Sequence, residues 1–417
     1  MTASNQPYRR WLWPAGLLAA CLLLTLALWL SRAWIWLGVP PINAERTPFS
    51  DTIAQLASAI NCAHGFGQWH GRVCFVPDID TVPRMQAYEP WLSFERWGLD
   101  TIDSATPIAV LLLLVFCAAL ALTLRPINLR ESLLGLALFA TSGVQLAVER
   151  GNFDLLLMAM ICLAGAALAR PARWSGIAGA AVLSLATMLK LYTGAATALA
   201  WTVARAPWRL MLPVSLLAIA LAVVVVGPSE LLVLRQGAPE GATRFSTGAR
   251  WLYLHRGATA AISAVIVALV ATSLAAFWLR RQRPDFGRWP QRAAVFQIAF
   301  LTAVPLFLLK DSYDYRLVLW LPCLALPMAM LRAGAPVSVG WRRLAAAVIV
   351  LFFLVAAVEL PCYWLDRLQG SGSAVWSHWL AGQLSAGLVY AKQFSSWLLA
   401  GLLSLVFCHL QWQRWRG

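Results

Sequence analysis

The sequence has little charge. Of its 417 residues, only 12% are charged and 60% are hydrophobic, with a mean hydropathy of +0.68. A soluble domain carries about 25% charged residues, so this chain has about half the usual proportion of charged residues. The shortage excludes an ordinary soluble protein and predicts a polytopic membrane protein.

Other absences narrow the classes of function. The sequence has no Walker-type or dinucleotide-binding glycine loop, so nucleotide-driven chemistry is not expected. It has no HExxH motif and no Ser-His-Asp arrangement, and its five histidines are scattered, which argues against a hydrolase. No internal repeat is evident, which weakens the case for an inverted-repeat transporter.

Long hydrophobic runs recur from end to end. A hydrocarbon core about 30 Å thick needs about 20 apolar residues per helix. We therefore expect an all-α polytopic fold, one domain over residues 1–417, with about twelve spans. The first run is too long for a cleaved signal peptide. The predicted spans lie near 11–37, 106–124, 132–148, 153–169, 175–189, 192–204, 210–227, 258–279, 293–309, 316–331, 344–361 and 387–410.

The net charge of +15 comes from 30 arginines and only three lysines. Most arginines fall in alternate loops, with Arg244 and Arg250 as exceptions, so they report topology rather than nucleic-acid binding. This places both termini in the cytoplasm. Of the 18 carboxylates, only Glu131 and Asp285 then lie on the cytoplasmic side. We expect the polar chemistry on the extracytoplasmic face of the membrane.

The largest predicted outer loop covers residues 38–105. Within it, the segment PFSDTIAQLASAI has apolar residues at the spacing of one helix face. This predicts a helix lying on the membrane surface, with Asp51 at its N-terminal end. Asp51 is then either a helix cap or a general base.

The same loop contains two cysteines and two histidines. An oxidising outer compartment permits a disulfide between Cys62 and Cys74. A zinc site made by these cysteines with His64 and His70 has suitable ligand types but an unfamiliar spacing. Both alternatives stay open, and no metal site is expected elsewhere.

The stretch VERGNFDLLLM places polar residues at the entrance of the predicted fourth span. An ionisable group at membrane depth costs roughly 2.5–3.5 kcal/mol, so it usually has a partner or a function. Arg150 and Asp154 stand four residues apart and can pair on a helix, with Asn152 as its cap. The alternative is a polar pocket, which Glu149 also lines, whose cation faces an anionic ligand.

Two further outward clusters add cations. The first cluster is Lys190 and Tyr192, where one short predicted span ends and the next begins. The second cluster is the segment KDSYDYRL. The structural interpretation is a snorkelling lysine and a polar turn within an aromatic belt. With Asp51, however, these side chains place one candidate base and several cations on one face, which suits a lipid-linked phosphate. The candidate residues of the second cluster are Lys310, Asp314, Tyr315 and Arg316.

In their order along the chain, these motifs resemble those of the GT-C superfamily of membrane glycosyltransferases. The chain is most similar to the bacterial polyprenol-phosphate-mannose-dependent mannosyltransferases (glycosyltransferase family 87). The resemblance covers most of the chain, and ERGNFDLLL followed by a lysine about 40 residues later is its most specific part. The motifs are SDTIAQLASAI, AYEPWLSF, VERGNFDLLL, MLKLYTG and SYDYRLVLWLP.

The resemblance implies inverting transfer of mannose, or another hexose or pentose, from a polyprenyl-phosphate donor to an envelope glycan or glycolipid. Asp51 would take the proton of the acceptor hydroxyl. Lys190, then Arg150 and Arg316, would stabilise the departing phosphate, without a metal or other cofactor. Relatives often carry a histidine where this chain has Tyr313-Asp314-Tyr315, so the sugar is left open.

Two other functions compete with an enzyme. One is a transporter or flippase for a lipid-linked glycan, which would place charges in the middle of spans rather than at their outer ends. The other is a non-catalytic component of envelope assembly. Transfer of a labelled sugar to an acceptor distinguishes the enzyme from both of these alternatives.

Overall fold

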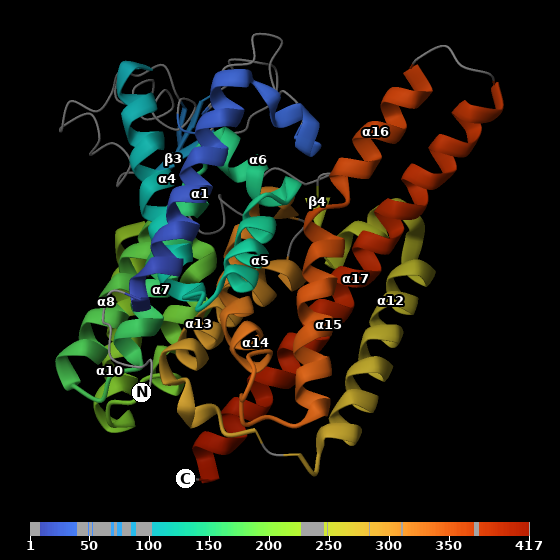
Figure 1. Cartoon of the computed structure of the whole chain (residues 1–417). Coiled ribbons are helices and arrows are strands. Elements are labelled where there is room, and N and C mark those ends of the chain that lie inside the picture. The colour runs from blue at the N-terminus through green and yellow to red at the C-terminus, as the bar shows by residue number, and fades with distance from the viewer. Residues whose placement is uncertain are drawn as a thin grey trace.

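The computed structural model describes residues 9–39, 49, 52, 68–70, 73–76, 85–88, 102–226, 246–247, 249–282, 284–309, 312–370 and 375–416. These residues form a bundle of mostly long helices (Figure 1). The protein is a helical, multi-pass membrane protein.

Seven helical spans in this part of the chain are long and apolar enough to cross a membrane. One of them joins α15 and α16 end to end. They comprise α1 (Arg9–Ser31), α4 (Ile102–Leu124), α10 (Trp208–Val226), α12 (Ala249–Leu279), α13 (Pro290–Leu309), α15 (Val339–Ala356) with α16 (Glu359–Gly370), and α17 (Val375–Arg416).

An eighth candidate span is broken. Helices α5 (Leu129–Phe139) and α6 (Ser142–Arg150) meet at a bend of 64°. Backbone freed by a break at membrane depth needs partners inside the protein. The Gln145 side chain supplies one by donating to the carbonyl of Phe139 at 2.8 Å. It also accepts from the indole of Trp34 in η1 (Ala33–Leu37) at 3.2 Å.

Three apolar segments are shorter than a full span: α7 (Asp154–Leu168), α8 (Arg173–Leu189), and η5 (Asp314–Leu324) continued by α14 (Ala325–Met330). At 1.5 Å per residue, α7 is roughly 22 Å long. The span predicted at 192–204 is divided into η2 (Leu191–Thr193), α9 (Gly194–Ala198) and η3 (Ala200–Thr202). Hydropathy measures apolar length and does not detect such breaks, so twelve spans remain a prediction.

Helix α7 lies in the middle of the bundle, packed against α4, α8, α13 and η5. Its sequence is apolar on every face after Asp154, as expected for a helix enclosed on all sides. Gly165 allows α13 to come close, because a Cβ at this position would lie 2.6 Å from the Cα of Val295. Small residues permit such contacts between membrane helices.

Short strands were not part of the all-α prediction. Strands β1 (Gln68–His70), β2 (Val73–Val76) and β3 (Met85–Tyr88) form an antiparallel sheet in the order β1-β2-β3. Strand β4 (Ser246–Thr247) pairs antiparallel with β5 (Ser312–Tyr313).

Most of the predicted outer loop at 38–105 lies outside the described residues. This applies to the predicted surface helix, of which only Phe49 and Thr52 are described, and to Asp51. Cys62 is also outside, and Cys74 is described only as a position in β2. The disulfide and the zinc site therefore stay predictions.

The bundle has two chemically different ends. The start of α1 and the end of α17 lie toward one of them, and the three-stranded sheet lies at the other (Figure 1). We call the first the arginine end, because it carries Arg125, Arg170, Arg288, Arg292 and Arg332, and the second the loop end.

Candidate anion-binding site

A tight turn joins α6 to α7 at the loop end. Gly151 has a φ of 59°, in the left-handed region that favours glycine. A Cβ at this position would also lie only 2.5 Å from the hydroxyl oxygen of Thr52. The side chain of Asn152 then accepts a hydrogen bond from the backbone N–H of Asp154, the first residue of α7, at 2.8 Å. The N-cap position itself is occupied by Phe153, one residue after Asn152.

This turn places Arg150 and Asp154 on different helices. Arg150 is the last residue of α6, beside the buried Glu149, and Asp154 is the first residue of α7. The prediction of an ion pair between them on one helix is wrong. Spacing in the sequence implies a shared face only when the helix is continuous, and Gly151 interrupts it.

Asp154 instead binds side chains from later in the chain. Its carboxylate is fully buried, and its Oδ1 atom lies 2.7 Å from the Nζ atom of Lys190. The hydroxyl of Tyr192 donates to the same Oδ1 atom. The Nε atom of Arg316 lies 4.0 Å from Oδ2. A buried carboxylate is tolerated when it is paired in this way.

The end of α8 positions Lys190. The helix stops at Leu189, and Lys190 is extended, with φ and ψ of −151° and 117°. Its Nζ atom also donates to the Oδ1 atom of Asn152 at 3.1 Å. The ring of Tyr192 is near both cations: its centroid lies 5.9 Å from the Nζ atom of Lys190 and 5.4 Å from the guanidinium of Arg316.

These residues have more positive than negative charge. We call Asn152, Asp154, Lys190, Tyr192 and Arg316 the Asp154 cluster. It contains two cations and one carboxylate, so its formal charge is +1. The side chains of Lys190 and Arg316 are 15% and 21% exposed, whereas that of Asp154 is 0% exposed. The negative charge is thus hidden and the cations are accessible, which suits an anionic ligand.

Two described residues of the predicted loop at 38–105 contact the protein beside this cluster. The backbone N–H of Phe49 donates to the carbonyl of Glu149 at 2.7 Å. The hydroxyl of Thr52 donates to the carbonyl of Gly151 at 2.6 Å. The described residues that flank position 51 in the sequence therefore contact the turn that leads into α7.

The side chains of three predicted site residues are not described. Asp51 and Lys310 lie outside the described residues, and Tyr315 is described by its backbone alone, in η5. The roles proposed for them stay predictions. Of the remaining predicted residues, the structure brings together Asn152, Asp154, Lys190, Tyr192 and Arg316, with Glu149 and Arg150 at the adjacent end of α6.

Asp314 belongs to a different cluster. Its Oδ2 atom pairs with the ammonium of Lys392 in α17, which lies 2.9 Å from the Oε1 atom of Glu359 in α16. All three side chains are buried. We call Asp314, Glu359 and Lys392 the Lys392 cluster. A 3₁₀-helix turns about 120° per residue, so η5 directs Asp314 and Arg316 to different neighbours.

Lys392 and Glu359 were not among the predicted site residues. The sequence did contain a signal for Lys392, because it is one of only three lysines and falls within the span predicted at 387–410. A charge within a span indicates a partner or a function. Nothing in the sequence identified Glu359 and Asp314 as those partners, since they lie 33 and 78 residues away.

The described part of the chain shows no group of three or more His, Cys, Asp or Glu side chains that could hold a metal ion. The Asp154 cluster instead offers an ammonium and a guanidinium, whose natural ligands are phosphate and carboxylate oxygens. Compared with family models, with curated proteins and with solved structures, the chain gives no match.

Proposed function

We propose that the protein transfers a sugar from a polyprenyl-phosphate donor to an envelope glycan or glycolipid, as a GT-C-like glycosyltransferase. The observation that supports this proposal is the surplus positive charge that Lys190 and Arg316 form around the buried Asp154. In the proposed topology, the loop end is extracytoplasmic, the termini are cytoplasmic, and the membrane is the bacterial cytoplasmic membrane.

The two cations act on the leaving group. The acceptor hydroxyl attacks the anomeric carbon with inversion, and the bond between this carbon and the phosphate oxygen breaks. The pair of electrons goes to polyprenyl phosphate, so negative charge grows on its oxygens. Cations held in advance where that charge develops lower the barrier. The polyprenyl tail remains among the apolar helices.

Asp154 is a positioning residue in this mechanism rather than the base. Its carboxylate is fully buried and paired with Lys190 and Tyr192, so it is not open to an acceptor hydroxyl. It fixes the ammonium of Lys190, while Asn152 accepts a second hydrogen bond from the same group. Preorganisation of this kind avoids reorganisation during the reaction.

Asp51 is the proposed base that takes the proton of the acceptor hydroxyl. Phe49 and Thr52, which lie on either side of it in the sequence, are hydrogen-bonded to Glu149 and Gly151 beside the Asp154 cluster, and these contacts support the proposal. A phosphate ester is a good leaving group, so the mechanism requires no metal ion.

A flippase for a lipid-linked glycan is the second candidate. The observation that favours it is Lys392, a charge buried within the membrane-spanning helix α17. Charged groups inside transmembrane helices often mark transport pathways. A flippase would move the lipid-linked sugar without breaking its phosphate bond.

Membranes containing the full-length protein and a radiolabelled polyprenyl-phosphate sugar test the proposal. The wild type is expected to move label to a glycan or glycolipid, and Asp51→Asn to abolish this transfer without lowering expression. Asp285→Asn, the same change in an exposed carboxylate at the arginine end, is the control and should retain transfer. Full transfer by Asp51→Asn would exclude Asp51 as the base. Label that crosses the membrane while still attached to polyprenyl phosphate would favour the flippase.

A further inference from the structure

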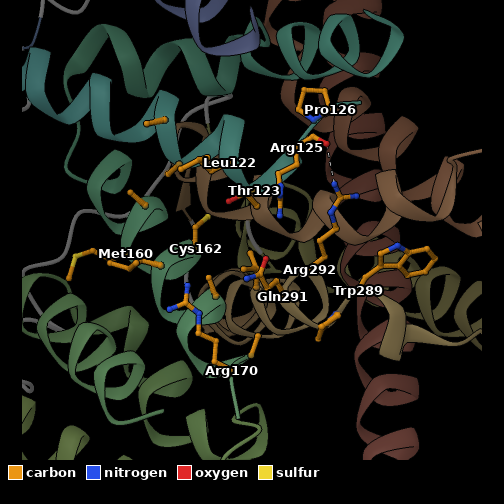
Figure 2. Close-up of a pocket in the computed structure, with 18 of the residues that line it drawn as sticks. Leu122, Thr123, Arg125, Pro126, Met160, Cys162, Arg170, Trp289, Gln291 and Arg292 are labelled. Carbon is orange, nitrogen blue, oxygen red and sulfur yellow. Dashed lines mark hydrogen bonds between the residues drawn. The ribbon is translucent and has the colours of Figure 1, made fainter. Parts of the chain in front are cut away.

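A large cavity lies at the arginine end, between α4, α7 and α13. Its volume is about 920 Å³, and its walls are formed mainly by apolar side chains such as Ala119, Leu122, Met160 and Leu163 (Figure 2). Ligand sites in proteins have volumes of about 300–1,000 Å³. Leu122 and Leu163 are 51% and 61% exposed, so the cavity opens on the surface that faces the membrane.

Arginines surround the polar side of this cavity, and none of its described lining residues is acidic. Three of the five arginines already have partners. Arg332 pairs with Glu131 at 2.8 Å, and Arg288 pairs with Asp285 at 3.4 Å. Arg292 donates to the backbone carbonyl of Leu124 at 2.9 Å.

The other two arginines are Arg125 and Arg170. Both are exposed, and neither side chain forms a hydrogen bond or an ion pair with any residue that the structure describes. Figure 2 shows them extending from opposite sides toward the middle of the cavity. Two guanidinium groups beside an apolar cavity provide the contacts that a phosphate and a hydrocarbon chain require.

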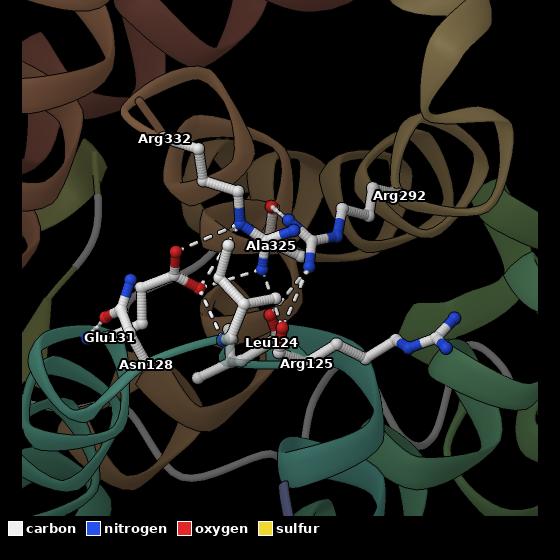
Figure 3. A network of polar contacts seen from close by, with 8 residues as sticks. Leu124, Arg125, Asn128, Glu131, Arg292, Ala325 and Arg332 are labelled. Atoms are coloured by element: carbon white, nitrogen blue, oxygen red, sulfur yellow. Dashed lines mark hydrogen bonds and ion pairs between the residues drawn. The ribbon is translucent and has the colours of Figure 1, made fainter. Parts of the chain in front are cut away.

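The backbone of Arg125 is held firmly in place. Its carbonyl accepts hydrogen bonds from Arg332 at 2.6 Å and from Arg292 at 3.3 Å. Glu131 is occupied by Arg332 through both carboxylate oxygens. Figure 3 shows the side chain of Arg125 extending away from Glu131 and Arg332. This network orients one cation toward the cavity and keeps the nearest carboxylate from neutralising it.

We infer that this cavity binds an acidic glycerophospholipid of the membrane leaflet at the arginine end. Its phosphate lies between Arg125 and Arg170, and an acyl chain lies along α4 and α7. Basic pockets between membrane helices bind anionic lipid head groups by this combination of charge and apolar surface. A zwitterionic lipid adds a positive charge next to the arginines and is therefore held less well.

This site is separate from the proposed donor site. Helix α7 begins at the Asp154 cluster and ends next to Arg170, and its 15 residues span roughly 22 Å. The inference therefore does not rest on sugar transfer, and either proposal can fail alone.

Lipid binding by the full-length protein in detergent micelles provides the test. Micelles are doped with equal amounts of phosphatidylglycerol and phosphatidylcholine, and the lipids retained on the purified protein are counted by native mass spectrometry. The wild type is expected to retain phosphatidylglycerol preferentially. Arg125→Gln with Arg170→Gln is expected to lower that preference about tenfold.

Two further variants define the site. Arg130→Gln with Arg173→Gln removes the same charge from exposed arginines that do not line the cavity, and it should preserve the preference. Ala166→Phe fills the cavity without changing charge and should reduce the retention of phosphatidylglycerol. Thermal unfolding verifies that each variant is folded.

Three outcomes would overturn the inference. The first is an unchanged lipid preference in the Arg125 and Arg170 double variant. The second is an equal loss in the Arg130 and Arg173 variant, which would assign the effect to diffuse charge. The third is equal retention of phosphatidylcholine by the wild type.

Discussion

Two clusters of charge near the loop end differ in sign and in access to solvent. The Asp154 cluster has two cations around one carboxylate, and its Lys190 side chain is partly exposed. The Lys392 cluster has two carboxylates around one ammonium, and all its side chains are buried. Helix η5 belongs to both, because it contributes Arg316 to one and Asp314 to the other.

This difference separates a binding site from a structural contact. An accessible cation with its counter-ion hidden below it can still bind an anion from outside. A buried ammonium shared by two carboxylates is already saturated and has no open face. The Lys392 cluster therefore joins η5, α16 and α17, and in doing so it holds Arg316 in position for the Asp154 cluster.

The largest expected effect follows from removing the central charge of the Lys392 cluster. Lys392→Met leaves Asp314 and Glu359 buried beside each other without a cation, and breaking a buried ion pair costs about 3–5 kcal/mol. We expect a large drop in the thermal unfolding temperature of the purified protein. Adding Asp314→Asn and Glu359→Gln to this variant should recover part of the stability. No recovery would mean that packing of Lys392, rather than its charge, holds the helices together.

Lys190→Gln should separate function from stability. We expect sugar transfer to fall about 10²–10³-fold, the usual effect of removing one group that stabilises developing charge. Because Tyr192 and Arg316 still contact the buried Asp154, the unfolding temperature should change less than in Lys392→Met. Steady-state kinetics with varied donor concentration measure the effect. Unchanged kcat and KM for the donor would assign Lys190 to anchoring at the membrane interface.

Asp154→Asn tests the hidden counter-ion. The amide keeps a hydrogen-bond acceptor for Tyr192 but leaves Lys190 and Arg316 without their shared carboxylate. We expect a loss of about 1–3 kcal/mol in stability, less than for Lys392→Met, because both cations can still reach water. Chemical denaturation in detergent measures this difference. A loss equal to that of Lys392→Met would show that the two clusters do not differ in access to solvent.

The smallest effect is expected for Thr52→Val. This change removes the hydrogen bond to Gly151 while preserving the shape of the side chain, which costs about 1 kcal/mol. Transfer should fall a few-fold, because the loop that carries Asp51 is held less firmly. Thr302→Val is the matched control, since that hydroxyl bonds only within its own helix α13. Equal activity of the two variants would mean that the hydrogen bond between Thr52 and Gly151 does not contribute to sugar transfer.

Much of the membrane architecture could be predicted from hydropathy. The apolar runs near 106–124, 210–227, 258–279 and 293–309 correspond to α4, α10, α12 and α13. The prediction was less successful where helices break. Gly151 separates Arg150 from Asp154, and the run at 192–204 is divided into three short pieces, because polar contacts made elsewhere in the fold allow the backbone to depart from one helix.

The sequence by itself determined that this chain is a helical membrane protein with polar residues concentrated at the ends of its apolar runs. The cost of charge in hydrocarbon is the reason, since it acts on each segment separately. Only the tertiary structure decided which charges meet: Asp154 with Lys190 and Arg316, and Lys392 with Asp314 and Glu359. Pairing depends on which helices pack together and which way their side chains point, and neither follows from spacing along the chain.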